Sequence, residues 1–442
     1  MGGIANEQAE PTDLDGIDRY MPRELALDLQ HIYIDYLWQL VPLLHPPSHL
    51  HALDAGFDKE SPEFLTVVLA IATYTTALAP NAWIDVPPAE LYGFLVGLIE
   101  TLEGRIKVMV AQGLTFSCLV SQYLLVAALD SLDLHDQSML AWAQVVQMTT
   151  MLRLFEEDHY IGLDLLERET HLRMYWLVFG GDKSHSCSFT HPPALRSVDF
   201  GPVTHVQPLP DEYMSAEGSL SKVPRSEAIL GFRYVSRLFE ILEKAEILYH
   251  AGRFRLAWDE VRATLNRFDE INFENEKALV GCERPFRLDS GDLLASDLEA
   301  NANSWTSAEA DSSSQNRWDR PDPYVVAKAN IYMTQLITKC YISKAKQIVI
   351  DRSGYPFAPE HDHARLTRSL CEELLFILRC WPPQAVAVNG RTVLGKVRWI
   401  ASHRLEQNLE DLDEHDQQVL LDMLTVFGNI EARSLVTPVR AT

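Results

Sequence analysis

Hydrophobic residues recur at helical spacing along most of the chain, in segments separated by proline and glycine. Near the N-terminus, Leu25, Leu29 and Ile32 fall on one side of a helix, and the Pro46-Pro47 pair ends that element. Further helices are expected from residue 62 and over 87–109, 115–129, 137–155, 165–179, 226–251, 254–268, 325–349, 364–379, 392–409 and 416–430. Strand-like alternation is confined to a short stretch near 203–207. The pattern therefore predicts an all-α fold, a large array of helices with long irregular loops and no substantial sheet.

Three segments differ in composition from the helical remainder. Residues 1–21 are polar and acidic and are expected to form a flexible tail. Residues 22–440 form one helical domain in this prediction, interrupted by the acidic and serine-rich excursion 287–323, which has too few aliphatic residues to order itself. Residues 184–213 carry five prolines and are expected to be irregular.

The charge balance argues against one class of function. The 442 residues contain 62 Asp and Glu against 38 Lys and Arg, which gives a net charge of −24. Because phosphate backbones are bound by clustered cations, we expect no direct nucleic-acid binding. The uncharged runs 64–84 and 108–129 contain too many polar residues to span a bilayer, so we expect core helices there and no membrane contact.

The cysteine and histidine positions give no case for a metal, a cofactor or a nucleophile. The six cysteines lie between residues 118 and 380 and none is spaced as Cys-x-x-Cys, so neither a zinc site nor a disulfide framework is expected. Three His-Asp dipeptides and a histidine-rich loop over 45–51 lack further ligands at suitable spacing. The run 180–184, Gly-Gly-Asp-Lys-Ser, lacks the glycine spacing of a phosphate-binding loop. We therefore expect no cofactor and predict that the chain is not an enzyme.

The most informative stretch is 165–200, which begins with a predicted helix. Glu169 and Arg173 are four residues apart, in the favourable order for an ion pair, and Trp176 falls on the same face. The helix is expected to end at the glycine pair 180–181. We place Trp176 in the core and the ion pair at the edge of the helix, near the surface.

The order of residues in this stretch resembles the regulatory region of fungal zinc-cluster transcription factors, often called the middle homology region. That region has Glu, then Arg, an aromatic residue and Trp, followed by an acidic–basic pair and a Pro-x-x-Leu segment. Lys183 stands where the family usually has Arg, and the glycine pair stands where the family usually has Leu or Val. The matching positions that we take as the candidate structural or regulatory site are Glu169, Arg173, Trp176, Asp182, Lys183 and Pro193.

Shorter fragments elsewhere follow the family order. They lie at 32–45, 61–65, 141–154, 329–334 and 389–398, and the last two look like the later part of regulators of starch, maltose and quinate use. The similarity spans roughly residues 25–405.

The resemblance implies a transcriptional regulator or co-regulator of a fungal metabolic pathway, serving biosynthetic or nutrient-use genes in the nucleus. Family members carry a zinc cluster of six closely spaced cysteines, whereas the cysteines here are scattered. The chain is therefore expected to act through protein partners, such as a full-length zinc-cluster factor, or through a small-molecule inducer. The alternatives are the regulatory half of a truncated zinc-cluster factor and an enzyme that reuses the helical scaffold.

Overall fold

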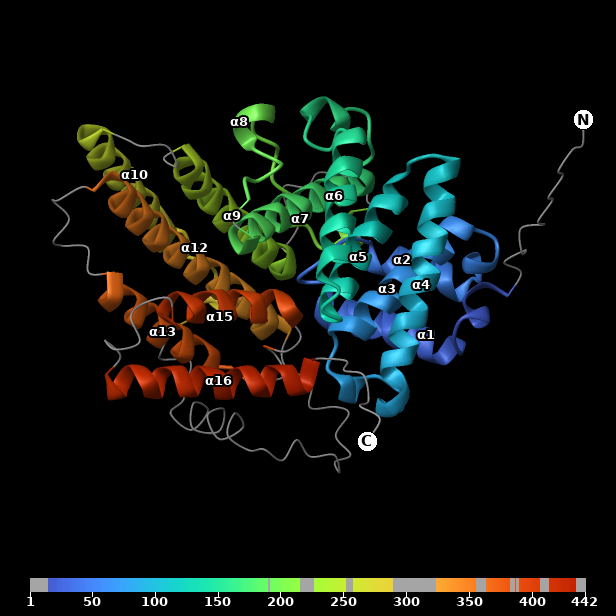
Figure 1. Cartoon of the computed structure of the whole chain (residues 1–442). Helices are drawn as coiled ribbons and strands as arrows, with labels where there is room; N and C mark the ends of the chain where they lie inside the picture. The colour runs from blue at the N-terminus through green and yellow to red at the C-terminus, as the bar shows by residue number, and fades with distance from the viewer. Residues whose placement is uncertain are drawn as a thin grey trace, which may run out of the picture.

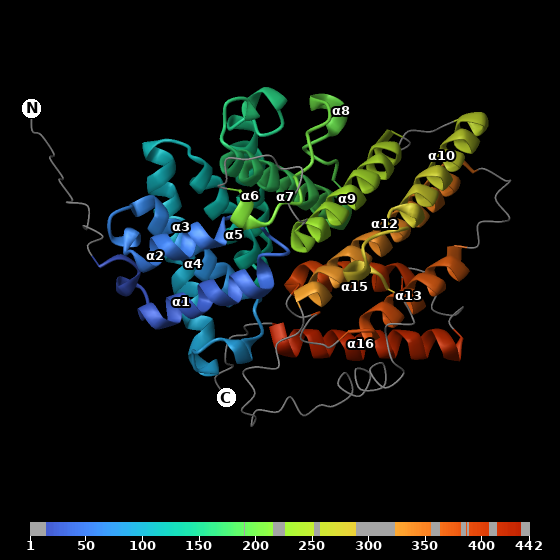
Figure 2. The same ribbon diagram turned by 180° about the vertical axis from the view of Figure 1, so that it is seen from behind.

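The computed structural model describes residues 15–189, 191–214, 226–251, 257–288, 323–354, 363–381, 386, 389–405 and 413–434. Within these ranges the chain forms fourteen α-helices and no strand, so the all-α prediction is confirmed. The helices near the N-terminus lie on one side of the molecule and those near the C-terminus on the other, with α7 (Leu165–Phe189) between them (Figure 1 and Figure 2).

Six helices form the N-terminal side. They are α1 (Arg23–Ile32), α2 (Pro46–Asp54), α3 (Pro62–Leu78), α4 (Pro88–Gln112), α5 (Phe116–Ser131) and α6 (His135–Met151). Helix α3 begins as the sequence predicts, with Pro62 in its first turn and the Ser61 hydroxyl accepting a hydrogen bond from the Phe64 N–H at 3.1 Å. It packs against α1, α4 and α5, and its buried residues make it the centre of this side.

Six further helices form the C-terminal side. They are α9 (Glu227–Ala251), α10 (Trp258–Lys277), α12 (Pro323–Ser353), α13 (His363–Arg379), α15 (Gly390–Leu405) and α16 (Glu414–Ser434). Helix α12 packs against α9 and α10 and also against α13 and α15. Its Ile331 and Ile337 belong to a large hydrophobic core that extends through the N-terminal side. Its Met333 and Leu336 belong to a smaller core shared with α13, α15 and α16, so α12 joins the two cores.

Helix α7 does not end at the glycine pair. It continues through Gly180 and Gly181 to Phe189, so the expected end at Phe179 is wrong. A methyl group on Gly180 would lie 2.6 Å from Cδ2 of Phe239, and one on Gly181 would overlap the ring of Trp142. The glycines therefore allow two aromatic rings to approach the backbone of a continuous helix, and they do not mark a helix end.

The structure describes seven residues before position 22. Residues 15–21, expected to belong to the tail, contain a short 3-10 turn, and the Ile17 side chain in it is fully buried. The Ile17 N–H donates a hydrogen bond to the Asp58 carboxylate at 2.8 Å. A flexible tail is therefore the wrong description of residues 15–21, because burial of Ile17 and this bond anchor them, while residues 1–14 lie outside the described residues.

The two segments expected to be irregular have different outcomes. In 184–213, the first residues belong to α7, and the remainder holds the short helix α8 (Ser197–Phe200). In 287–323, residues 289–322 lie outside the described residues. The Leu288 N–H at its start donates to the Tyr332 hydroxyl at 2.8 Å.

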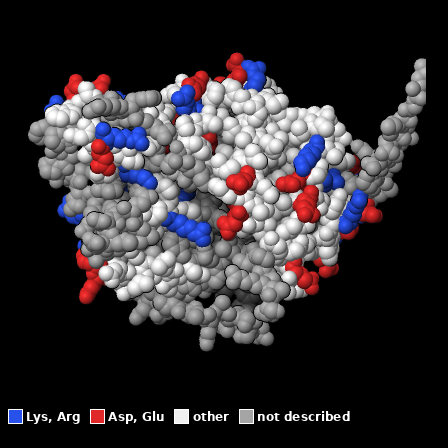
Figure 3. All heavy atoms as spheres, in the orientation of Figure 1, with Lys and Arg blue, Asp and Glu red and all other residues white. Residues whose placement is uncertain are grey.

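The helices and the surface have three further properties. Within the described ranges, no helix combines the length and apolar composition that crossing a bilayer requires. The six cysteines are buried and carry free thiols. On the face drawn in Figure 3, the described Lys and Arg side chains are interspersed with Asp and Glu and form no continuous basic surface.

We predict that Gly181→Ala lowers the free energy of unfolding by about 1–3 kcal/mol, because the new methyl group overlaps Trp142. The Trp142 ring is itself stacked on His185, with centroids 4.6 Å apart, so it has little room to shift. Urea unfolding followed by circular dichroism measures the change. The matched control is Gly104→Ala on the exposed side of α4, where nothing lies within 4 Å of the added carbon and a gain of about 0.5–1 kcal/mol is expected. Equal effects at the two glycines would contradict the close-packing explanation.

Candidate functional site

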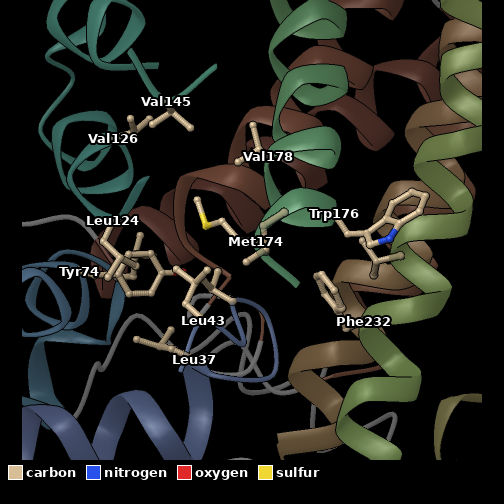
Figure 4. Packing of buried hydrophobic residues seen from close by; sticks show 14 of the residues in the cluster. Leu37, Leu43, Tyr74, Leu124, Val126, Val145, Met174, Trp176, Val178 and Phe232 are labelled. Atoms are coloured by element: carbon tan, nitrogen blue, oxygen red, sulfur yellow. The ribbon is translucent and has the colours of Figure 1, made fainter. Parts of the chain in front are cut away.

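Trp176 lies in the core, as expected from the sequence. The side chain is 4% exposed, and its indole N–H donates to the Thr204 carbonyl at 3.0 Å. The ring stacks on His205, with centroids 4.1 Å apart and an angle of 7° between the planes. Figure 4 shows Trp176 extending from α7 toward α9 and Phe232, whereas Met174 points to the other side of α7. Trp176 thus connects α7 to the irregular segment 191–214.

Glu169 and Arg173 are not at the surface, so that part of the sequence prediction is wrong. Both side chains are fully buried. Glu169 accepts a hydrogen bond from the Gln207 N–H at 2.7 Å, and Arg173 Nη2 lies 3.5 Å from Asp211 Oδ1. Burial raises the pKa of Glu169 and lowers the pKa of Arg173, because both groups lose water. Their partners lie in the 191–214 segment, which folds back over α7.

Asp182 and Lys183 bind the same segment further along. Asp182 Oδ1 accepts from the Ala194 N–H at 3.0 Å, and its Oδ2 accepts from the Leu195 N–H at 2.9 Å. Lys183 Nζ lies 3.0 Å from Asp182 Oδ2 and donates to the Leu195 carbonyl. Pro193, the other residue taken from this part of the sequence, is buried where these bonds hold the turn. The acidic–basic pair therefore clamps the Pro-x-x-Leu segment to α7.

Helix α9 contributes a second carboxylate to this clamp. Lys183 Nζ lies 3.4 Å from Glu243 Oε1, and the same oxygen accepts from the Ser197 N–H at 2.9 Å. Both carboxylates and the ammonium group are nearly or fully buried. The six candidate residues thus share one role, which is to fix the 191–214 segment between α7 and α9.

A cavity of about 160 Å³ lies beside this assembly, where the N-terminal and C-terminal sides meet. Its wall includes Gly180 and Gly181, and the rings of Phe239 and Trp142, which also line the cavity, pack against these two glycines. Helices α3, α5, α6, α7, α9, α12 and α15 all contribute to the wall. The aromatic residues of the lining are Tyr74, Tyr123, Trp142, Trp176, Phe232 and Phe239. Such a mixture of aromatic walls and a few polar groups is typical of small-molecule sites.

The polar part of the lining includes two titratable groups with lowered pKa values. Burial lowers the pKa of His185 to about 4, so the imidazole is neutral near pH 7. Burial lowers the pKa of Lys396 to about 7. Lys396 Nζ donates to Thr334 Oγ1 at 2.8 Å and to Asn330 Oδ1 at 3.1 Å. Perturbed groups that line a cavity are candidates for ligand contacts.

Neither Lys396 nor His185 is among the site residues predicted from the sequence. The available signal was weak: Lys396 precedes Ile400 by one helical turn, so it falls on the apolar face of its helix. His185 lies on the continuation of α7, beyond the point where the helix was expected to end. Both residues reach the cavity only because helices distant in sequence pack there.

The histidine-rich stretch 45–51 is not a surface loop, because most of it forms helix α2. His45 caps that helix through the Ser48 N–H, and its Nε2 lies 2.9 Å from the Asp211 carbonyl. His49 is buried, with Nε2 2.8 Å from Gln30 Oε1. These side chains diverge, so they do not share a ligand.

The His-Asp dipeptides are also dispersed. Residues 135–136 open α6, and residues 361–362 lie outside the described residues. His415 is exposed, and its Nε2 lies 2.7 Å from Glu372 Oε1. In the part of the chain that the structure describes, no three His, Cys, Asp or Glu side chains come together in a way that could hold a metal ion.

Comparisons with known proteins add no relative. No model of a known protein family matches the chain, and no curated protein sequence matches it either.

We predict that Asp182→Asn lowers the free energy of unfolding by about 3 kcal/mol. The amide offers one acceptor oxygen where the carboxylate serves two backbone N–H groups, and the buried Lys183 loses one of its counter-charges. Chemical denaturation measures the difference. The control is Asp199→Asn, which weakens an exposed pair with Arg196 and should change stability by less than about 0.5 kcal/mol. A loss at Asp182 no larger than that at Asp199 would show that the clamp contributes little.

The neutral state of His185 predicts a pH dependence of stability. Its pKa is lower in the folded protein than in the unfolded chain, so the unfolded chain takes up the proton first and stability falls as the pH drops from about 6.5 toward about 4. Between about pH 7 and about pH 5, the wild type should lose about 2 kcal/mol more unfolding free energy than His185→Gln does. Urea titrations of both proteins at each pH give this difference. Parallel curves for the two would mean that His185 is protonated equally in both states.

Proposed function

We propose that the chain is the regulatory region of a transcriptional regulator or co-regulator of a fungal metabolic pathway, and that it senses a small molecule in its central cavity. The observation that carries the proposal is the position of the cavity. It lies at the junction of the two sides of the molecule, next to the helix whose sequence resembles the family signature. The role is one of binding and regulation and not of catalysis.

The walls of the cavity support a sensing role. Trp176 and Phe239 come from α7 and α9, Tyr74 and Tyr123 from the N-terminal helices, and Asn330 from α12. A ligand in this space touches both sides of the molecule at once. It would therefore favour whichever relative arrangement of the two sides gives it better contacts, which is the thermodynamic requirement for a regulatory ligand.

The signature residues support the family assignment through their shared geometry. Glu169, Arg173, Asp182 and Lys183 all bond to the 191–214 segment or to α9, and Trp176 does the same from the core. Because all of these residues hold the 191–214 segment against α7 and α9, their spacing along α7 has a common structural reason. The resemblance then supplies the regulatory function and the nuclear location as parts of the proposal.

Protein partners complete the proposed mechanism. A regulator of this kind acts when partners, among them a full-length zinc-cluster factor, distinguish its ligand-bound form from its ligand-free form. To shift such an equilibrium from about 1:99 to 99:1, the ligand must bind one form about 10⁴-fold more tightly than the other. Differential contacts across the cavity are the source of that preference.

We predict that the full chain, fused to a heterologous DNA-binding domain, changes reporter transcription in a fungal host. Because the inducer is unidentified, output is measured on different carbon and nitrogen sources, and we expect it to vary several-fold among them. Val235→Phe, which adds volume inside the cavity, should make the output independent of the medium. The control is Val108→Phe, at a side chain that is 51% exposed on α4 and remote from the cavity lining.

Two results would count against the proposal. One is a fusion that leaves transcription at the level of the DNA-binding domain alone on every medium. The other is a Val235→Phe variant whose medium dependence equals that of Val108→Phe. Ala127→Leu, which adds an aliphatic side chain at another position of the same cavity, separates loss of sensing from loss of folding, and thermal unfolding confirms that each variant is folded.

A further inference from the structure

We propose that the central cavity binds a small ligand bearing a single carboxylate, and that Lys396 is its counter-charge. The inference rests on the proposed function, because it assigns the ligand class of the same cavity. Three features support it: the surroundings of the Lys396 ammonium group, the rest of the lining and the size of the space.

The Lys396 side chain is 4% exposed, and its two hydrogen-bond acceptors are neutral. They are Thr334 Oγ1 and Asn330 Oδ1, both on α12. An ammonium group has three donors, so one N–H remains beyond these two bonds. Among the described residues, no carboxylate lies within 4.0 Å of Nζ.

The position of Nζ is at the wall of the cavity. Its acceptor Asn330 is a lining residue, and so is Phe239, whose ring centroid lies 5.6 Å from Nζ. The remaining donor is therefore close to the empty space and does not need to cross packed protein to reach a ligand. Helix α15 holds the lysine there through Val397 and Ile400, which are fully buried in the smaller core.

A buried lysine without an acidic partner is costly, because the charged form loses its hydration and gains no counter-charge. The lowered pKa of Lys396 is the consequence of that burial. An anionic ligand would raise the pKa of Lys396 again, because a carboxylate beside Nζ supplies the missing counter-charge in a medium of low dielectric constant. This is the chemical reason to assign an anion to this end of the cavity.

The other lining groups restrict the ligand further. Asp130 also lines the cavity and is half-buried. Because its carboxylate repels a second one, the ligand carboxylate is disfavoured near Asp130 and favoured at Lys396. His185 is neutral near pH 7 and adds no second positive charge. One cation and a wall of aromatic and aliphatic side chains match one carboxylate on an apolar body. A volume of about 160 Å³ is close to that of an engineered protein cavity that holds benzene, so the body is about one ring in size.

The test compares two probes of the same shape, benzoate and benzamide, by isothermal titration calorimetry on the full chain at neutral pH. The wild type should bind benzoate roughly tenfold or more tightly than benzamide, because charged hydrogen bonds contribute more than neutral ones. Lys396→Met should bind the two probes equally. Lys396→Gln, which keeps a polar group, should also lose the preference.

The matched control is Lys339→Met on α12, since Lys339 pairs with Glu373 and does not line the cavity. It should keep the preference for benzoate. The proposal is overturned if the wild type binds neither probe, if it binds both equally, or if Lys396→Met retains the preference. Thermal unfolding of each variant excludes loss of folding as the cause, and a buried lysine replaced by methionine should not destabilise the fold.

The outcome is separable from that of the proposed function. One outcome is that the wild type shows no preference for benzoate while reporter output still depends on the medium and Val235→Phe abolishes that dependence. This combination would remove the carboxylate assignment and leave the sensing role in place. Benzoate binding through Lys396 in a chain that does not affect transcription would retain the ligand site and remove the regulatory role.

Discussion

Four of the charged side chains on helix α7 are buried, and each must find its partner inside the protein. Glu169, Arg173, Asp182 and Lys183 find most of their partners in the 191–214 segment, which runs beside the helix. Burying any of them without a partner would cost several kcal/mol. The proline-rich segment must therefore follow a path that places its backbone N–H and carbonyl groups and Asp211 beside these side chains. The segment, α7 and Glu243 of α9 are thereby held as one unit. The position of Trp176, and with it one wall of the cavity, follows from this unit.

The cavity depends on a second constraint, which is the packing of aromatic rings directly against the α7 backbone. Gly180 and Gly181 admit Phe239 and Trp142 at distances that any larger residue would prevent. Protein interiors are otherwise close-packed, so an open space bordered by rigid rings is unusual. Its buried apolar lining residues belong to the large core, so filling the space changes the contacts of that core with residues from both sides of the molecule. This is the structural basis for regarding the space as a site of regulation.

Two buried lysines in this chain show how surroundings decide a role. Lys183 lies within 3.4 Å of two carboxylates, and its charge is used within the fold. Lys396 is also buried, but its ammonium group donates hydrogen bonds to the Thr334 hydroxyl and the Asn330 side-chain amide, which are neutral. The sequence shows only one of these partners, because Asp182 is adjacent to Lys183, whereas Glu243, Thr334 and Asn330 lie on other helices. The difference in counter-charge makes one lysine a structural element and the other a candidate for contact with a ligand.

The sequence by itself determined the helical class and most helix positions, because the apolar period and the prolines act within a few residues of each other. The start of α3 at Ser61 and Pro62 is an example of such local control. It also identified Trp176 as a core residue. Only the tertiary structure decided that Glu169 and Arg173 are buried, that α7 continues through its glycines, and that Lys396 and His185 line a cavity with Trp176. The reason is that burial, close approach and counter-charge depend on residues tens to hundreds of positions away, which the local pattern does not encode.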